Sequence, residues 1–154
     1  MKLSDEPALA VLNALLAVCT DSQQGYENAA ADITDPELAR VFNGYAEQRI
    51  KFADELHDRI RTLRREPDMS GTVGGDVHRA WMDVKAAMAS AQHHAVLVEC
   101  ERADALAAKA YGAALQTRDL DEDTRRLIQR QYEAVQAAHD RVRQLRDSAT
   151  YAHR

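Results

Sequence analysis

The fold is decided by the stretch from Asp35 to Leu63, which reads DPELARVFNGYAEQRIKFADELHDRIRTL. It opens with the features of a helix start, because Asp35 can cap free backbone N–H groups and Pro36 is tolerated at the first helical position. Arg49 lies near the middle of the apolar face of this helix. The apolar residues recur at steps of three and four, which is typical of a long amphipathic helix: Leu38, Val41, Phe42, Tyr45, Phe52, Leu56, Ile60 and Leu63.

The composition indicates a single all-α domain covering residues 1–154. A chain of 154 residues can bury a substantial core, and its few Gly and Pro residues cluster in the expected loops. The net charge of −5 is modest, and Arg and Lys are spread along the expected helices. This spread argues against nucleic-acid binding. No apolar run reaches the roughly 18 residues that a membrane span needs.

The N-terminal region needs a separate test, because the apolar run 8–19 ends in Leu-Ala-Val-Cys, as a lipoprotein signal does. Asp5 and Glu6 stand where such a signal needs positive charge, so we expect this run to be the buried face of a first helix. Cys19 and Cys100 fall inside expected helices. Buried free thiols in a reducing compartment are preferred to a disulfide, which predicts a cytoplasmic protein.

The periodicity predicts four long helices and one short helix. The four-residue connection between the first two long helices makes them antiparallel neighbours, and the same reasoning applies to the last two. We therefore expect an up-down-up-down four-helix bundle with an extra short helix between long helices two and three. The long helices are expected at about 5–31, 36–65, 91–117 and 121–148, and the short helix at about 76–89.

Residues 76–117 allow two interpretations. A continuous helix of about 40 residues would reach roughly 60 Å and overhang its neighbours by several turns. The overhang would expose Trp81 and would then pair with a second copy of the chain. The preferred interpretation is a break near Ser90, which would cap the third long helix. The short helix would then lie across the open end of the bundle, with Trp81 as its anchor.

A polar layer is expected on the inner faces, halfway along the bundle. Arg49 and Asp104 each lie 15 residues from a turn, the first near Thr34 and the second near Asp119. A buried Arg49–Asp104 ion pair would fix helix order and register. The alternatives are a small-ligand or anion site around Arg49, or a different register in which these groups lie at the edges of the inner faces. The expected members of the layer are Gln23, Arg49, Asp104, Gln131 and His139.

Metal binding is the second candidate function, because four-helix bundles often hold two metals through glutamates and Glu-x-x-His motifs. The chain contains no Glu-x-x-His. Glu55, Glu99 and His139 are expected at similar heights and could hold one iron, manganese or zinc ion. The permanent charge of Arg49 opposes a cation near the centre, so the preferred expectation is that no cofactor binds.

A set of short stretches between Leu12 and Asp147 carries a resemblance: Leu12–Leu16, Gly25-Tyr26, Asp35–Leu38, Gln48-Arg49, His78-Arg79, Glu99–Arg102, Lys109–Tyr111, Gln131-Tyr132 and Ala138–Arg141. They resemble a family of small bacterial four-helix-bundle proteins that is grouped with the ferritin-like superfamily and has no assigned function. The resemblance implies a ferritin-like bundle and, since relatives in that superfamily often act in stress responses, an association with stress. It does not imply iron storage, because the ferritin ligand pattern is missing here.

Two functions follow from these observations. The first is a non-catalytic, stress-associated bundle that acts through oligomerisation, such as dimerisation, or through partner binding, with a structural polar layer. The second is a metal-binding or metal-oxidising protein with its site at Glu55, Glu99 and His139. The first is preferred.

Overall fold

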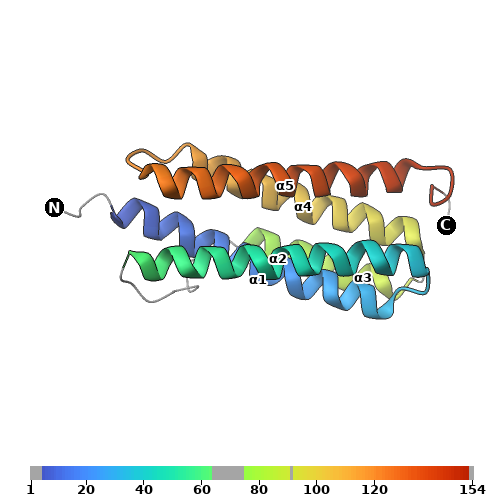
Figure 1. Cartoon of the computed structure of the whole chain (residues 1–154). Coiled ribbons are helices and arrows are strands. Elements are labelled where there is room, and N and C mark those ends of the chain that lie inside the picture. The colour runs from blue at the N-terminus through green and yellow to red at the C-terminus, as the bar shows by residue number, and fades with distance from the viewer. Residues whose placement is uncertain (1–4, 64–74, 91, 153–154) are drawn as a thin grey trace.

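The computed structural model consists of five α-helices and describes residues 5–63, 75–90 and 92–152. These residues contain no strand, which confirms the all-α class. Among them, no helix is both long enough and apolar enough to span a membrane. The helices are α1 (Asp5–Asp32), α2 (Pro36–Thr62), α3 (Gly75–Met88), α4 (His93–Leu115) and α5 (Glu122–Asp147), as Figure 1 shows.

Two of the expected helix boundaries involve residues outside the described part of the chain. These are residues 64–65, at the expected end of the second long helix, and residue 91, at the expected start of the third. The single-domain organisation stays a prediction.

Capping aspartates begin two of the long helices. The Asp35 carboxylate accepts hydrogen bonds from the backbone N–H groups of Glu37 and Leu38, at 2.9 and 3.1 Å. Asp121 accepts one from the N–H of Thr124 at 3.1 Å. Each cap satisfies backbone donors that have no partner within the helix, and the carboxylate also suits the positive end of the helix dipole.

The four long helices form two antiparallel hairpins, α1–α2 and α4–α5, whose turns lie at opposite ends of the bundle (Figure 1). Side-chain contacts agree with this arrangement. Cys19 meets Tyr111, whereas Tyr26, seven residues later in α1, meets Asp104, seven residues earlier in α4. Helices α1 and α4 are therefore antiparallel, and the long helices run up, down, down, up. The alternating order expected from the sequence is wrong, because the chain crosses back along the bundle between α2 and α4.

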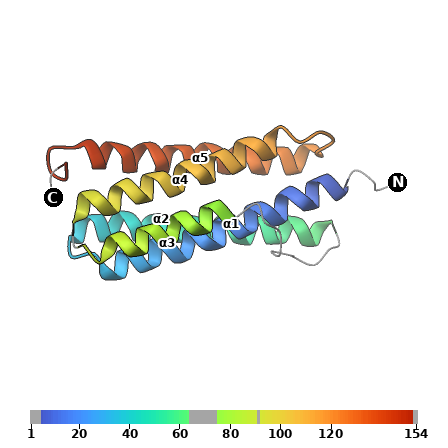
Figure 2. The ribbon, with the colours of Figure 1, turned by 180° about the vertical axis from the view of Figure 1, so that it is seen from behind.

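Helix α3 is part of this crossover. It packs lengthwise against α1 and α4 instead of lying across the end of the bundle, which corrects the expected position (Figure 2). Trp81 does anchor it: its ring lies edge-on to Tyr26, with 4.6 Å between ring centroids. The indole also lies directly against the backbone of Gly25 in α1. A larger residue at this position would hold α3 away from α1.

Helices α3 and α4 are separate, so the interpretation of 76–117 as one continuous helix is wrong. Ser90 lies in the turn between them, where its hydroxyl donates to the Ala87 carbonyl at 2.7 Å and accepts from the Gln92 N–H at 3.2 Å. The N-cap of α4 is Gln92, which makes no side-chain capping bond, and not Ser90 as expected. The hydroxyl of Ser90 therefore stabilises the turn and the end of α3.

The contact between Gly25 and Trp81 yields a prediction about stability. A Cβ atom added at Gly25 would lie less than 3.0 Å from Cδ2 and Cε3 of the indole, so Gly25→Ala forces α3 to shift. We expect a loss of about 1–3 kcal/mol in unfolding free energy, measured by urea denaturation. Gly44→Ala is the matched control, because a Cβ there would meet nothing within 4 Å. It should be neutral or stabilising by up to about 1 kcal/mol, since alanine favours helix. Equal effects of the two substitutions would contradict this packing.

Candidate functional site

A fully buried ion pair lies at the centre of the bundle. Arg49 Nη1 donates to Asp104 Oδ1 at 2.8 Å and Nη2 donates to Oδ2 at 3.1 Å, with the two side chains 1% and 0% exposed. This two-point geometry is the strongest arrangement available to a guanidinium and a carboxylate. Each residue is the central one of its helix, since Arg49 has 13 residues of α2 on either side and Asp104 has 11 of α4. The pair therefore links the middle of α2 to the middle of α4.

Tyr26 of α1 completes the group. Its hydroxyl donates to Asp104 Oδ2 at 2.5 Å, and its ring centroid lies 5.5 Å from Cζ of Arg49. The remaining Nε–H of Arg49 donates to Gln48 Oε1 at 3.0 Å. The carboxylate thus accepts three hydrogen bonds, and the cation is held by hydrogen bonds on one side and by an aromatic face on another. A charge pair buried to this extent is stable only when its partners are satisfied in this way.

Tyr26 and Arg49 keep their protonation states over the physiological range. Burial raises the pKa of Tyr26 well above its ordinary value, and the charge of Asp104 raises it further. Burial alone would lower the pKa of Arg49, but the charge and hydrogen bonds of Asp104 more than offset this effect, so the pKa rises. Tyr26 remains a donor and Arg49 remains a cation. Neither side chain can serve as an acid or base near neutral pH.

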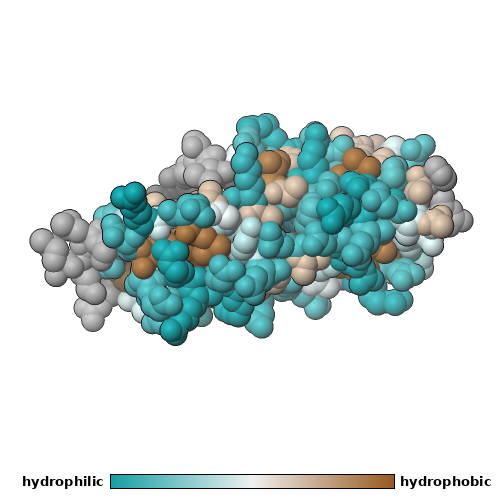
Figure 3. Space-filling model, turned by 90° about the horizontal axis from the view of Figure 1, so that it is seen from above, coloured by the Kyte–Doolittle hydropathy of each residue, from teal (hydrophilic) through white to brown (hydrophobic). Residues whose placement is uncertain are grey.

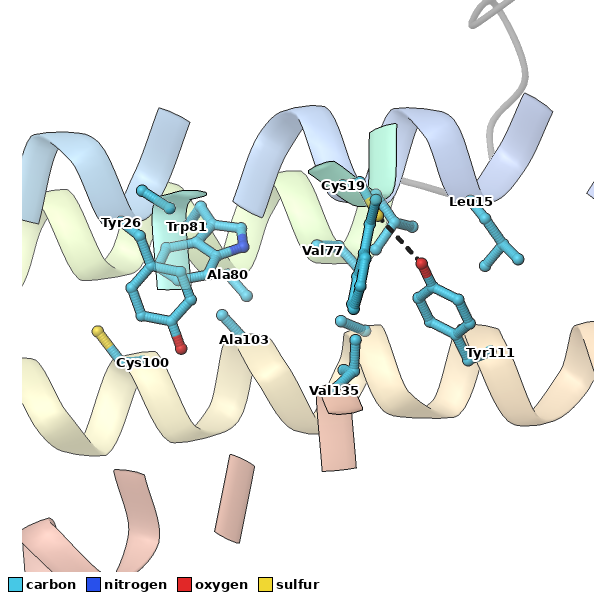
Figure 4. Packing of buried hydrophobic residues seen from close by; sticks show 14 of the residues in the cluster. Leu15, Cys19, Tyr26, Val77, Ala80, Trp81, Cys100, Ala103, Tyr111 and Val135 are labelled. Atoms are coloured by element: carbon cyan, nitrogen blue, oxygen red, sulfur yellow. Dashed lines mark hydrogen bonds between the residues drawn. The ribbon is translucent and has the colours of Figure 1, made fainter. Parts of the chain in front are cut away.

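A second buried chain of hydrogen bonds begins with the contact between Cys19 and Tyr111 (Figure 4). The Tyr111 hydroxyl lies 3.0 Å from Cys19 Sγ and donates to Gln131 Oε1 at 2.7 Å, so the thiol is the donor in the first contact. Gln131 Nε2 donates to the Phe52 carbonyl at 3.2 Å and to Glu55 Oε1 at 3.0 Å. Burial raises the pKa of Cys19 to about 11. A buried thiol with this pKa is not a nucleophile at neutral pH.

The other expected members of the polar layer lie elsewhere. Gln23 is half-buried and bonds to Glu27 on the surface of α1 at 3.3 Å, while Ser22 and Tyr26 are buried. Helix α3 packs on α1 at Gly25, and Ser22 and Ala29 on this side are also buried, so the buried face of α1 is wider than its apolar run alone indicates. His139 lies at the edge of the core, with 17% of its side chain exposed, and its Nε2 is 2.8 Å from Glu101 Oε1.

The three residues considered as metal ligands are each bound to different partners. His139 contacts Glu101, Glu99 accepts from Arg102 at 2.6 Å, and Glu55 accepts from Gln131. Within the described residues, no group of three His, Cys, Asp or Glu side chains is placed to hold a metal ion. Helix α4 runs in the same direction as α2, opposite to the expected direction. Glu99 and Glu55 therefore lie on opposite sides of the level of Asp104, which explains their separation.

Sequence reasoning missed the polar roles of Tyr26, Tyr111 and Cys19. The sequence predicts Cys19 as a buried thiol and gives Tyr26 only within the resemblance, so neither side chain is assigned a hydrogen bond. A signal was present, because a buried tyrosine hydroxyl needs a hydrogen-bond partner, and the inward-facing Asp104 and Gln131 were the available acceptors.

Comparison with known proteins places the chain in a family. The family described as Domain of unknown function (DUF2383) matches residues 7–117, which is 111 of the 154 residues, so the chain belongs to this family. The matched region includes Tyr26, Arg49 and Asp104. A search of curated proteins finds no match to the chain.

The ion pair predicts an asymmetry between single and double substitutions. Asp104→Ala leaves Arg49 buried without its anion and should lower the unfolding free energy by roughly 3–5 kcal/mol. Replacing both residues, as in Arg49→Met with Asp104→Leu, should cost much less, because no charge is stranded. Urea denaturation of the three proteins measures both effects. If the double variant loses as much stability as Asp104→Ala, the two side chains are not buried as a pair.

The raised pKa of Cys19 predicts a loss of stability at alkaline pH. An unfolded thiol titrates near pH 8.5 and the folded one at about pH 11, so the folded chain binds the proton more tightly. The contribution is present below about pH 8.5 and is lost as the pH rises to about 11. Over this interval the wild type should therefore lose roughly 2–3 kcal/mol more unfolding free energy than Cys19→Ala. Parallel pH profiles would show that the thiol is accessible in the folded protein.

Proposed function

We propose that this member of the DUF2383 family is a non-catalytic, ferritin-like four-helix bundle that acts by binding protein partners, copies of itself included. The Arg49–Asp104 pair carries the proposal. Proteins of the ferritin-like class hold their metals between the inner faces of the helices, through carboxylates and histidines. Here the corresponding space holds a cation whose partners are already satisfied, and a permanent positive charge opposes the binding of a metal cation.

The path of the chain supports the ferritin-like part of the proposal. Ferritin-like bundles differ from simple up-and-down bundles by one long crossover connection. In this protein the connection between α2 and α4 runs back along the bundle and includes α3 (Figure 2). The likeness concerns the fold, and an activity has to be argued from the site itself.

The chemistry of the interior supports a structural role for the polar layer. Arg49, Tyr26 and Cys19 are each at most 1% exposed, and their protonation states do not change near neutral pH. A substrate could not reach them without opening the core. We therefore assign function to the surface of the bundle, where a partner can bind while the interior keeps its register.

A cytoplasmic location and a stress-associated role belong to the same proposal. Cys19 and Cys100 are free and buried, which suits a reducing compartment. The association with stress rests on the resemblance to the ferritin-like superfamily alone.

Metal analysis tests the proposal. Protein purified without a histidine tag is incubated with iron(II), manganese(II) or zinc(II), passed through a desalting column and analysed by mass spectrometry of the elements. We expect well below one metal ion per chain in every case. One ion per chain that is lost on Glu55→Gln or His139→Ala would contradict the proposal, and Glu133→Gln on the exposed face of α5 serves as the control substitution.

A further inference from the structure

A continuous apolar depression follows the N-terminal half of α1 and the C-terminal half of α4. Its first part has a volume of about 220 Å³ and is lined only by apolar residues, among them Ala10, Ala14, Ala110 and Ala113. Its second part, of about 190 Å³, shares Ala110 and Ala113 and extends to the start of α3. The two parts form one groove along α4.

The segment of α1 that borders this groove lacks the polar outer face that the rest of the bundle has. The run 8–19 of α1 contains Asn13 as its one polar residue before the cysteine, and outward positions such as Ala10 are apolar. By contrast, the outer face of α2 carries charged residues such as Glu47 and Lys51. The face in Figure 3 is likewise mostly hydrophilic, with hydrophobic residues in small areas. A helical segment that is apolar on all sides, as residues 8–19 nearly are, is normally covered on all sides.

Helix α3 covers only part of the same face. It begins at Gly75 and lies along the parts of α1 and α4 that are distant from the N-terminus of α1 (Figure 2). Its first turn, through Asp76 and Val77, forms one wall at the end of the groove. Among the described residues, no helix covers the remainder of this face.

We infer that a second copy of the chain covers it, through a two-fold interface in which the groove of one copy receives α1 and α4 of the other. This rests on the proposed function and names one of its partners. Alanine side chains on both helices allow helices to approach at the short end of the usual 8–10 Å range. In a two-fold interface each contact occurs twice, with residue i of one copy facing residue j of the other and the reverse.

Charges at the rim fit such an interface. Lys109 of α4 is exposed and forms no ion pair with any described residue, and Asp76 of α3 lines the same part of the groove. The two side chains have opposite charge, so a two-fold axis can bring Lys109 of each copy to Asp76 of the other. Asp76 is also bonded to Arg79 within its own chain. Because the rim carries both Lys109 and Asp76, its charges can pair with those of a second copy across a two-fold axis.

The size of the groove sets the expected strength. Seven residues line its first part and six its second, with two shared, whereas a standard interface uses about 20–30 residues from each partner. Flanking residues of α1 and α4 must therefore contribute, and the dimer is expected to dissociate in the micromolar range.

Sedimentation velocity of the full chain, from about 1 to about 300 µM, tests the inference directly. We expect a reversible monomer–dimer equilibrium. Ala10→Glu and Ala113→Glu place a carboxylate at exposed positions in the groove and should each raise the dissociation constant at least tenfold. Ala137→Glu makes the same change on the exposed face of α5 and should leave it unchanged. Circular dichroism verifies that each variant is folded.

Exchanging the charges of Lys109 and Asp76 is a second test of the interface. Lys109→Asp alone and Asp76→Lys alone should weaken the dimer, and the two together should restore it, because opposite charges again meet across the axis. A chain that stays monomeric at all concentrations, or a dimer that Ala113→Glu does not weaken, would overturn the inference. A chain that stays monomeric would leave the proposed function standing with another protein as partner, and a dimer that Ala113→Glu does not weaken would leave it standing with a different interface. A bound metal would contradict that function and leave the dimer unaffected.

Discussion

The constraint on which the structure depends is that Arg49 and Asp104 must meet. Both side chains are removed from water, and leaving either one unpaired would cost several kcal/mol. The requirement fixes the height of α2 relative to α4, and the bond from Tyr26 extends it to α1. A pair of this kind contributes more to the choice of one arrangement than to net stability, because hydrophobic residues of similar size could fill the same space.

The choice of one arrangement matters because apolar packing alone does not fix the register of these helices. Helices α1 and α4 are rich in alanine, and small side chains do not interlock strongly enough to prevent one helix from sliding along another. The chain from Cys19 through Tyr111 and Gln131 to Glu55 acts in the same way and includes α5. The two polar groups together contact all four long helices, so the register that apolar packing leaves open is set by hydrogen bonds.

The sequence predicts the inward-facing polar residues better than it predicts the path of the chain. Helical periodicity places Arg49 on the inner face, and the pairing with Asp104 does not depend on the direction of α4, because each residue is at the centre of its helix. The direction of α4 could not be predicted from the sequence, since the connection after α2 is long enough for α4 to run either way along the bundle. Gln23 was expected inside the bundle but lies at the edge of the buried face of α1, where its amide reaches Glu27 on the surface.

The most direct test of the structural polar layer is nitrogen-detected NMR of the Arg49 side chain. The account predicts separate resonances for its two Nη groups at 25 °C, with N–H protons that exchange with water far more slowly than those of exposed arginines such as Arg126. These features should persist from about pH 5 to about pH 9, since the raised pKa of Arg49 keeps it charged. A single averaged Nη resonance with exchange as fast as that of Arg126 would contradict the account.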